Sequence, residues 1–123
     1  NCPLIRHNFE AWDFGPVLPY LYREFRRFNR APITCRATRI DASTGKKQVV
    51  EYYFDGETEK FLERIVAFYS RINTMDLVEL SHVKDGPWYK VWYHDGTINP
   101  GMKIDNDEIA KFYSKFSSPF SMQ

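Results

Sequence analysis

The nine residues from Phe9 to Val17 constrain the fold of this chain more than any other stretch. They hold three large aromatic side chains, and Gly15 and Pro16 come directly after the last of these. Glycine adopts backbone angles that are closed to other residues, and proline fixes φ near the helical value without needing a hydrogen-bond partner for its nitrogen. We therefore expect the start of a helix here, with Trp12 and Phe14 folding back on its first turns.

The segment 17–28 has the periodicity of an amphipathic helix. Apolar side chains recur at spacings of three and four residues, which places them on one face: Leu18, Leu21, Tyr22, Phe25 and Phe28. The opposite face carries four arginines at matching spacings: Arg23, Arg26, Arg27 and Arg30. Pro19 is tolerated only in the first turn, and Asn29 accepts left-handed backbone geometry. The helix should therefore end near Asn29.

The arginine stripe, defined as Arg23, Arg26, Arg27 and Arg30, has three possible interpretations. It can be a solvated face partly compensated by Glu24, a surface for an acidic protein partner, or a contact with nucleic acid. The whole chain carries 17 basic and 16 acidic residues, a net charge of +1. Because phosphate binding usually shows in the net charge, nucleic acid is the least favoured of the three.

Residues 33–40 and 48–53 have the pattern of two strands joined in a hairpin. Both runs are rich in β-branched and aromatic side chains, and Gly45 lies in the connection. A two-stranded hairpin is marginal alone in water, so it must lie against the helices.

We expect Cys35 to be a small buried residue. Two cysteines are too few for a disulfide scaffold and fit a reducing cytosol.

The strongest helical periodicity comes after the hairpin. Its apolar side chains all fall on one face of a helix: Phe61, Leu62, Ile65, Phe68, Tyr69 and Ile72. Asp55 is suited to cap the N-terminus of this helix. We therefore predict that it is the central core helix. Shorter helices should follow near residue 77 and from Pro87. A last helix should bury Ile109, Phe112, Tyr113 and Phe116.

These elements fit one α+β domain, mainly helical, with four to five helices and one β-hairpin packed on it. A chain of 123 residues suffices for one domain. We assign residues 1–116 to this domain and residues 117–123 to a C-terminal tail. No apolar run approaches the ~20 residues of a membrane span, and the N-terminus lacks a signal-peptide pattern. We therefore expect a soluble, cytoplasmic protein.

No group of residues has the pattern of an active site or a metal site. His82 and Asp85 suggest a catalytic pair, but no nucleophile stands at a supporting spacing. Cys2 and His7 lack a second pair of ligands at zinc-finger spacing. Residues 43–46 lack the upstream glycine and following helix of a phosphate-binding loop. We therefore predict a protein without catalysis, metal or cofactor.

Two separated motifs carry a family resemblance. The first reads Ala11-Trp12-x-x-Gly15-Pro16-Val17-x-Pro19-x-Leu21-Tyr22. The second reads Leu77-x-x-Leu80-Ser81-His82, followed by Asp85-x-Pro87-Trp88. In this order they resemble the Panacea domain, the family of SocA-like and GepA-like phage-associated proteins that serve as antitoxins or as proteolytic adaptors. The resemblance runs from about Pro3 to Phe116, which is most of the chain.

The resemblance implies a non-enzymatic protein-binding module whose partner is a cognate toxin. Such a module either neutralises the toxin directly or hands it to a protease. Monomer and homo-oligomer both stay open, and no membrane is involved. The arginine stripe is then the candidate contact, and the motif residues are expected to serve the fold: Trp12, Gly15, Pro16, His82, Pro87 and Trp88.

The alternative function is a nucleic-acid-associated phage or regulatory protein that uses the arginine helix.

A further expectation concerns the N-terminal part of the domain. The family normally has helices before the Ala-Trp motif, and this chain begins almost at that motif. We therefore expect an N-terminally incomplete domain with an uncovered apolar face, which would favour self-association.

Overall fold

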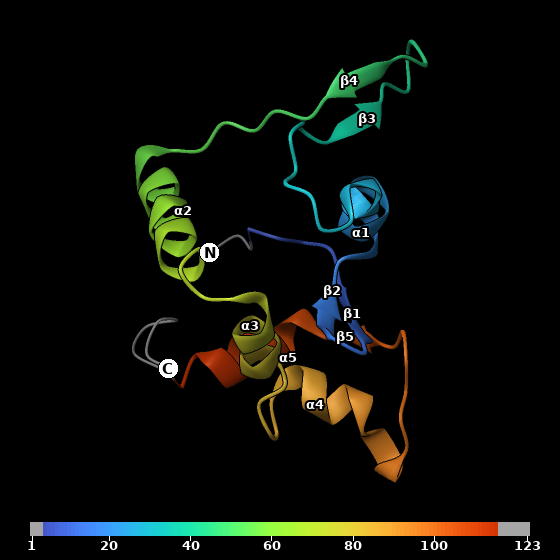
Figure 1. Cartoon of the computed structure of the whole chain (residues 1–123), viewed down its shortest axis with the longest axis vertical. Coiled ribbons are helices and arrows are strands. Elements are labelled where there is room, and N and C mark those ends of the chain that lie inside the picture. The colour runs from blue at the N-terminus through green and yellow to red at the C-terminus, as the bar shows by residue number, and fades with distance from the viewer. Residues whose placement is uncertain (1–3, 116–123) are drawn as a thin grey trace.

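The stretch 9–17 forms two antiparallel strands, so the predicted helix start at this place is wrong. The computed structural model describes residues 4–115. Strand β1 (Phe9–Trp12) pairs with β2 (Gly15–Val17). The short strand β5 (Lys103–Ile104) joins the other edge of β1, so the sheet order is β2-β1-β5 (Figure 1). Strands of two to four residues are too short to show an alternating pattern, which is why the sequence did not reveal this sheet.

Some predictions fall on residues that the structure does not describe. The proposed tail 117–123, the core position Phe116 and the thiol of Cys2 all lie outside residues 4–115. The assignment of residues 1–116 to one domain therefore stays a prediction.

The helix predicted over 17–28 is present but starts later. Helix α1 covers Pro19–Phe25, and a single 3-10 turn, η1, continues it over Arg26–Phe28. The later start follows from the sheet, because residue 17 belongs to β2 and Leu18 is a buried N-cap. The end is as predicted, since Asn29 follows η1 with a φ of +50°.

The predicted hairpin is confirmed with shorter strands. Strand β3 (Thr38–Ile40) pairs antiparallel with β4 (Lys47–Val49), and every residue of β4 is exposed. Glu24 ties the hairpin to α1, because its Oε1 accepts hydrogen bonds from the backbone nitrogen (3.0 Å) and the hydroxyl (3.4 Å) of Thr38. Within residues 4–115 Glu24 forms no ion pair with the arginine stripe.

Four α-helices follow the hairpin within the described residues: α2 (Gly56–Tyr69), α3 (Thr74–Ser81), α4 (Pro87–Trp92) and α5 (Asn106–Tyr113). The predicted cap of α2 is confirmed, since the Asp55 carboxylate accepts a hydrogen bond of 2.7 Å from the Thr58 nitrogen. This bond favours the charged carboxylate and lowers the pKa of Asp55. Asn73 caps α3 in the same way, accepting from the Asp76 nitrogen at 2.9 Å. The chain is thus α+β and mainly helical, as predicted.

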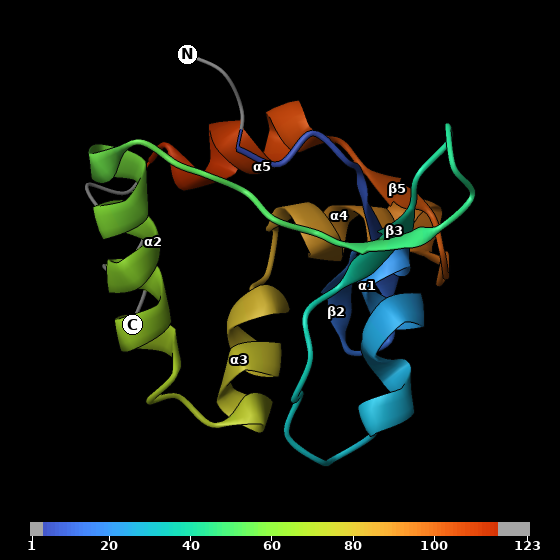
Figure 2. The ribbon, with the colours of Figure 1, turned by 90° about the horizontal axis from the view of Figure 1, so that it is seen from above.

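The core lies where α4 meets the three-stranded sheet. Ala11 of β1, Trp88 and Trp92 of α4 and Ile104 of β5 form one buried cluster, and Ile104 is only 1% exposed. The prediction that α2 is the central core helix is therefore wrong. No residue of α2 is buried, and the helix stands apart from this sheet in both Figure 1 and Figure 2. Periodicity reports that a helix has an apolar face, but it does not report what that face packs against.

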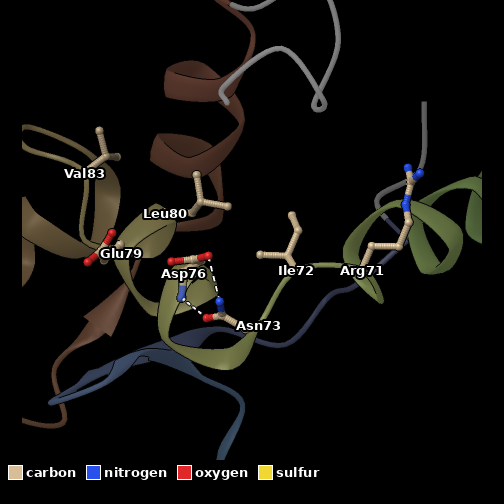
Figure 3. A pocket seen from close by; sticks show the side chains of 7 residues that line it. All are labelled: Arg71, Ile72, Asn73, Asp76, Glu79, Leu80 and Val83. Atoms are coloured by element: carbon tan, nitrogen blue, oxygen red, sulfur yellow. Dashed lines mark hydrogen bonds between the residues drawn. The ribbon is translucent and has the colours of Figure 1, made fainter.

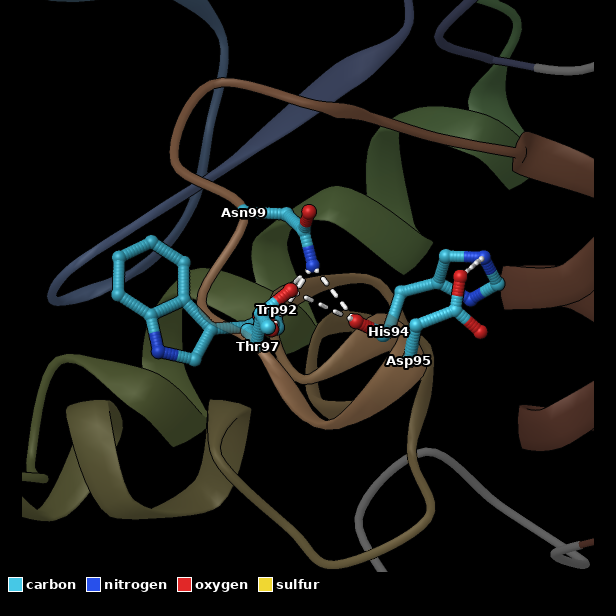
Figure 4. A network of polar contacts seen from close by, with 5 residues as sticks. All are labelled: Trp92, His94, Asp95, Thr97 and Asn99. Atoms are coloured by element: carbon cyan, nitrogen blue, oxygen red, sulfur yellow. Dashed lines mark hydrogen bonds and ion pairs between the residues drawn. The ribbon is translucent and has the colours of Figure 1, made fainter.

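Asn99 holds the chain where α4 ends. A 3-10 turn, η2 (His94–Gly96), follows the helix, and the Asn99 side-chain amide reaches back over it (Figure 4). The amide nitrogen donates to the carbonyl oxygens of Trp92 (3.4 Å), His94 (3.0 Å) and Thr97 (2.9 Å). These bonds satisfy carbonyl groups that the end of a helix leaves open, and so fix the position of Trp92 in the core.

None of the helices formed by residues 4–115 combines the length and the apolar character needed to cross a lipid bilayer.

Candidate functional site

The two sequence motifs meet in space, although about seventy residues separate them. The indole nitrogen of Trp88 donates a hydrogen bond of 2.8 Å to the backbone oxygen of Trp12. The Nε2 atom of His82 lies 3.0 Å from the backbone oxygen of Asp13. Gly15 lies against Ser81, so close that a β-carbon on Gly15 would stand 2.5 Å from the Ser81 hydroxyl oxygen. Each motif therefore supplies the surface on which the other packs.

His82 acts as a connector between α3 and the turn that joins β1 to β2. Its Nδ1 contacts the Val78 carbonyl and the Ser81 hydroxyl, while Nε2 faces Asp13 on the other side. The imidazole ring also lies on Trp88, with 3.8 Å between ring centroids. Asp85 makes no hydrogen bond or ion pair with His82 within the described residues. With both ring nitrogens directed at the protein's own backbone, the ring is placed to hold the fold.

Pro16 and Pro87 line a small apolar cavity beside the core. Its volume is about 120 Å³, and its walls also include Trp88, Ile104 and Tyr113. Trp12, in contrast, is only partly buried; its indole nitrogen donates to the Glu10 carboxylate at 3.1 Å. The motif residues thus lie in or beside the core.

Tyr113 should make the fold sensitive to alkaline pH. Burial, and secondarily the charge of Tyr69, raises the pKa of the Tyr113 hydroxyl above its usual 10.0. A raised native pKa means that the folded state holds this proton more tightly, so stability is intact below pH 10.0 and falls as pH rises through the native pKa. In thermal melts above pH 10.0, Tyr113→Phe should lose less stability than the parent. Tyr53→Phe, at a site 91% exposed, should behave as the parent does. Equal alkaline loss in all three proteins would contradict this assignment.

In the arginine stripe, Arg23 lies on α1, Arg26 and Arg27 lie on η1, and Arg30 lies two residues beyond η1. All four of its side chains are exposed. Arg23, Arg26 and Arg30 make no ion pair or side-chain hydrogen bond within residues 4–115. Arg27 differs, because its guanidinium donates to the Glu24 carbonyl and to the Cys35 sulfur, each at 3.0 Å. Three guanidinium groups are therefore available to a partner.

Cys35 is exposed, so the prediction of a buried thiol is wrong. It lies in the connection between η1 and β3, before the point where the hairpin forms. The predicted strand started at residue 33, and the ladder begins only at Thr38. Within the described residues no group of three or more His, Cys, Asp or Glu side chains could hold a metal ion.

Basic charge is concentrated around the stripe. Residues 19–54 hold eight basic and three acidic side chains, a net charge of +5. Residues 55–115 hold eight basic and eleven acidic side chains, a net charge of −3. The hairpin adds four cations that the sequence analysis did not single out: Arg36, Arg39, Lys46 and Lys47. A count of charge by segment would have found them, because the near-neutral total conceals the separation.

All eight cations of residues 19–54 are exposed, and we call this group the basic surface. The elements that carry it, α1, η1 and the β3–β4 hairpin, lie at the end of the molecule opposite α4 (Figure 1). Arg36 is the only member of the hairpin set that forms an ion pair in residues 4–115, at 3.4 Å from the Glu51 carboxylate. Both side chains of this pair are more than half exposed, so the pair is weak. The surface can bind carboxylates or phosphates, since arginine donates paired hydrogen bonds to either group.

Comparison with known proteins supports the resemblance seen in the two motifs. Residues 1–89 match the family described as Antitoxin SocA-like, Panacea domain. The chain is 34% identical over 115 residues to the protein named Antitoxin SocA of Caulobacter vibrioides (strain NA1000 / CB15N). This alignment covers 93% of the chain and 61% of the relative, so the chain spans less than two thirds of that protein's length. No solved structure matches the chain. The chain belongs to the SocA-like Panacea domain family of antitoxins.

Proposed function

We propose that this protein is an antitoxin that binds a cognate toxin protein in the cytoplasm, without catalysis or cofactor. The family and the named relative support an antitoxin role in general. The observation that carries the proposal here is the basic surface, with three exposed guanidinium groups that the described chain leaves without ion pairs. Such a surface fits a toxin that presents carboxylates at its contact face.

The geometry favours binding over chemistry. His82 contacts backbone carbonyls on two sides, and Trp88 is buried in the core. Arg23 and Arg26, in contrast, stand on the preformed elements α1 and η1, so little backbone ordering is needed there when a partner arrives. Arginine is also enriched among the residues that dominate the energetics of protein interfaces.

Two modes of neutralisation are compatible with such a contact. A direct inhibitor covers the toxin and leaves its amount unchanged. An adaptor holds the toxin while a protease degrades it, so the toxin disappears from the cell. Toxin lifetime, measured after synthesis is stopped with and without this protein, separates the two modes.

Co-expression with the gene next to the one for this protein tests the proposal, because a toxin and its antitoxin are usually encoded side by side. We expect the protein to restore growth to cells that express the toxin, and we expect the two proteins to purify together. Absence of both rescue and co-purification would remove the antitoxin function. The amount of soluble antitoxin in the same cells is the folding control, since it shows whether a failure to rescue growth comes from misfolding.

A nucleic-acid contact is the second candidate, and the charge separation favours it. A net charge of +5 over residues 19–54 is sufficient for several phosphate contacts. DNA binding measured at increasing salt concentration tests this candidate. A steep loss of affinity with salt, reduced in an Arg23→Ala/Arg26→Ala variant, would support it. No binding at low salt would exclude it.

A further inference from the structure

Helix α2 has an apolar face that the described chain does not bury. Phe61 is 41% exposed, and Leu62 and Ile65 are only partly covered. The helix has 14 residues, a length at which an isolated helix is marginal in water. Helices of this kind gain their stability by packing an apolar face against something else. The face is therefore suited to a further binding contact.

A groove lies beyond the end of α2, along α3 and the residues that flank it (Figure 3). Its volume is about 580 Å³, and Ile72, Leu80 and Val83 form the apolar part of its lining. Asp76 and Glu79, one turn apart on α3, supply carboxylates, and Arg71 lies at the opposite end. The groove thus combines three aliphatic side chains with two carboxylates, and a guanidinium group lies at the end away from Glu79.

The acidic end is not compensated by the described chain. Glu79 is exposed and makes no ion pair or side-chain hydrogen bond within residues 4–115. The Asp76 carboxylate accepts one hydrogen bond of 2.9 Å from the neutral Asn73 amide and meets no cation there. Like charges three residues apart on a helix repel each other. A cation from a partner would relieve this repulsion, which is a physical reason to expect a basic occupant.

We propose that the groove along α3 binds an amphipathic basic helix of a partner protein. The aliphatic stripe of that helix would cover Ile72, Leu80 and Val83, and its lysine or arginine side chains would meet Asp76 and Glu79. Arg71 sets the orientation of the bound helix, because an acidic residue of the partner is favoured at the end of the groove where Arg71 lies. Grooves of this kind bind helices through aliphatic anchors spaced three and four residues apart. This contact is separate from the basic surface proposed for the toxin and has the opposite charge.

A synthetic peptide tests the proposal without knowledge of the natural partner. The probe is a fluorescent 18-residue helix with leucines at spacings of three and four and lysines beside them, and binding is measured by anisotropy. The comparison peptide has glutamate in place of each lysine. We expect the basic peptide to bind and the acidic peptide to bind at least tenfold more weakly. Equal affinity for the two peptides, or no binding of the basic one, would overturn the proposal.

Two charge-matched variants locate the contact. Glu79→Lys places a cation in the groove, whereas Glu63→Lys makes the same charge change on the side of α2 away from its apolar face. We expect at least a tenfold loss of peptide affinity for Glu79→Lys and less than a twofold change for Glu63→Lys. Equal effects would show that the peptide does not bind in the groove. An Arg23→Ala/Arg26→Ala variant should bind the peptide as the parent does, so failure of this proposal is distinguishable from failure of the toxin contact.

Discussion

Trp88→Ala should destabilise this protein more than any other single truncation. The side chain is 4% exposed, stacks on Trp92 with 5.4 Å between ring centroids, and donates to the Trp12 carbonyl. Removing a buried aromatic ring usually costs about 3–5 kcal/mol of unfolding free energy. That is a large share of the roughly 5–15 kcal/mol that holds an average domain. Chemical denaturation followed by circular dichroism measures the loss.

Two further variants separate the parts of this effect. Trp88→Phe keeps most of the ring packing but leaves the Trp12 carbonyl without its donor, so an intermediate loss of about 1–3 kcal/mol is expected. Tyr53→Ala removes an aromatic side chain that is 91% exposed and should change stability by less than about 0.5 kcal/mol. A Trp88→Ala protein as stable as the parent but unable to bind toxin would place Trp88 in the functional site instead.

Gly15→Ala should be the second severe change, for two reasons that add. Gly15 has a φ of +124°, outside the left-handed region near +50 to +70° that other residues reach. The new β-carbon would also stand 2.5 Å from the Ser81 hydroxyl oxygen and 3.3 Å from the Ser81 β-carbon. Backbone strain alone is of order 1–3 kcal/mol, and the steric clash increases it. Thermal and chemical unfolding both report the total.

Gly45→Ala is the matched control for Gly15→Ala. Gly45 also has a positive φ, +70°, but nothing lies within 4 Å of the position its β-carbon would take. We expect Gly15→Ala to cost clearly more than Gly45→Ala. Adding Ser81→Gly to Gly15→Ala should recover part of the loss, since it removes both crowded atoms. Equal losses for the two glycine variants would show that the packing between the motifs does not constrain the fold.

The sequence predicted those structural features that neighbouring residues determine, such as the ends of helices. The cap at Asp55, the end of the helical segment α1–η1 at Asn29 and the start of α4 at Pro87 all follow from neighbouring residues, and all are confirmed. Strand β5 is two residues long and pairs with β1 from the far end of the chain. No local pattern marks it, although Ile104 is the most buried large side chain described.

The candidate site was predictable in part for the same reason. Helical spacing predicted that the arginines are exposed, and all four are. Spacing could not show that Arg27 is held by Glu24 and Cys35. It also gave no sign of the four further cations of the hairpin segment. The prediction about α2 was wrong because an apolar face indicates burial only if something covers it. Within the described residues that cover is incomplete.

The dissociation constant of the purified toxin complex tests the central claim most directly. The variant Arg23→Ala/Arg26→Ala removes two exposed guanidinium groups, and Lys60→Ala/Lys84→Ala removes the same charge from the other part of the molecule. Charge-assisted hydrogen bonds contribute about 1.5–3 kcal/mol each, and about 1.4 kcal/mol is a factor of ten in affinity. We predict at least a tenfold weaker complex for the arginine variant, an unchanged complex for the lysine variant, and melting temperatures close to the parent for both. Toxin binding that is equally tight for the parent and the arginine variant would contradict the proposed contact.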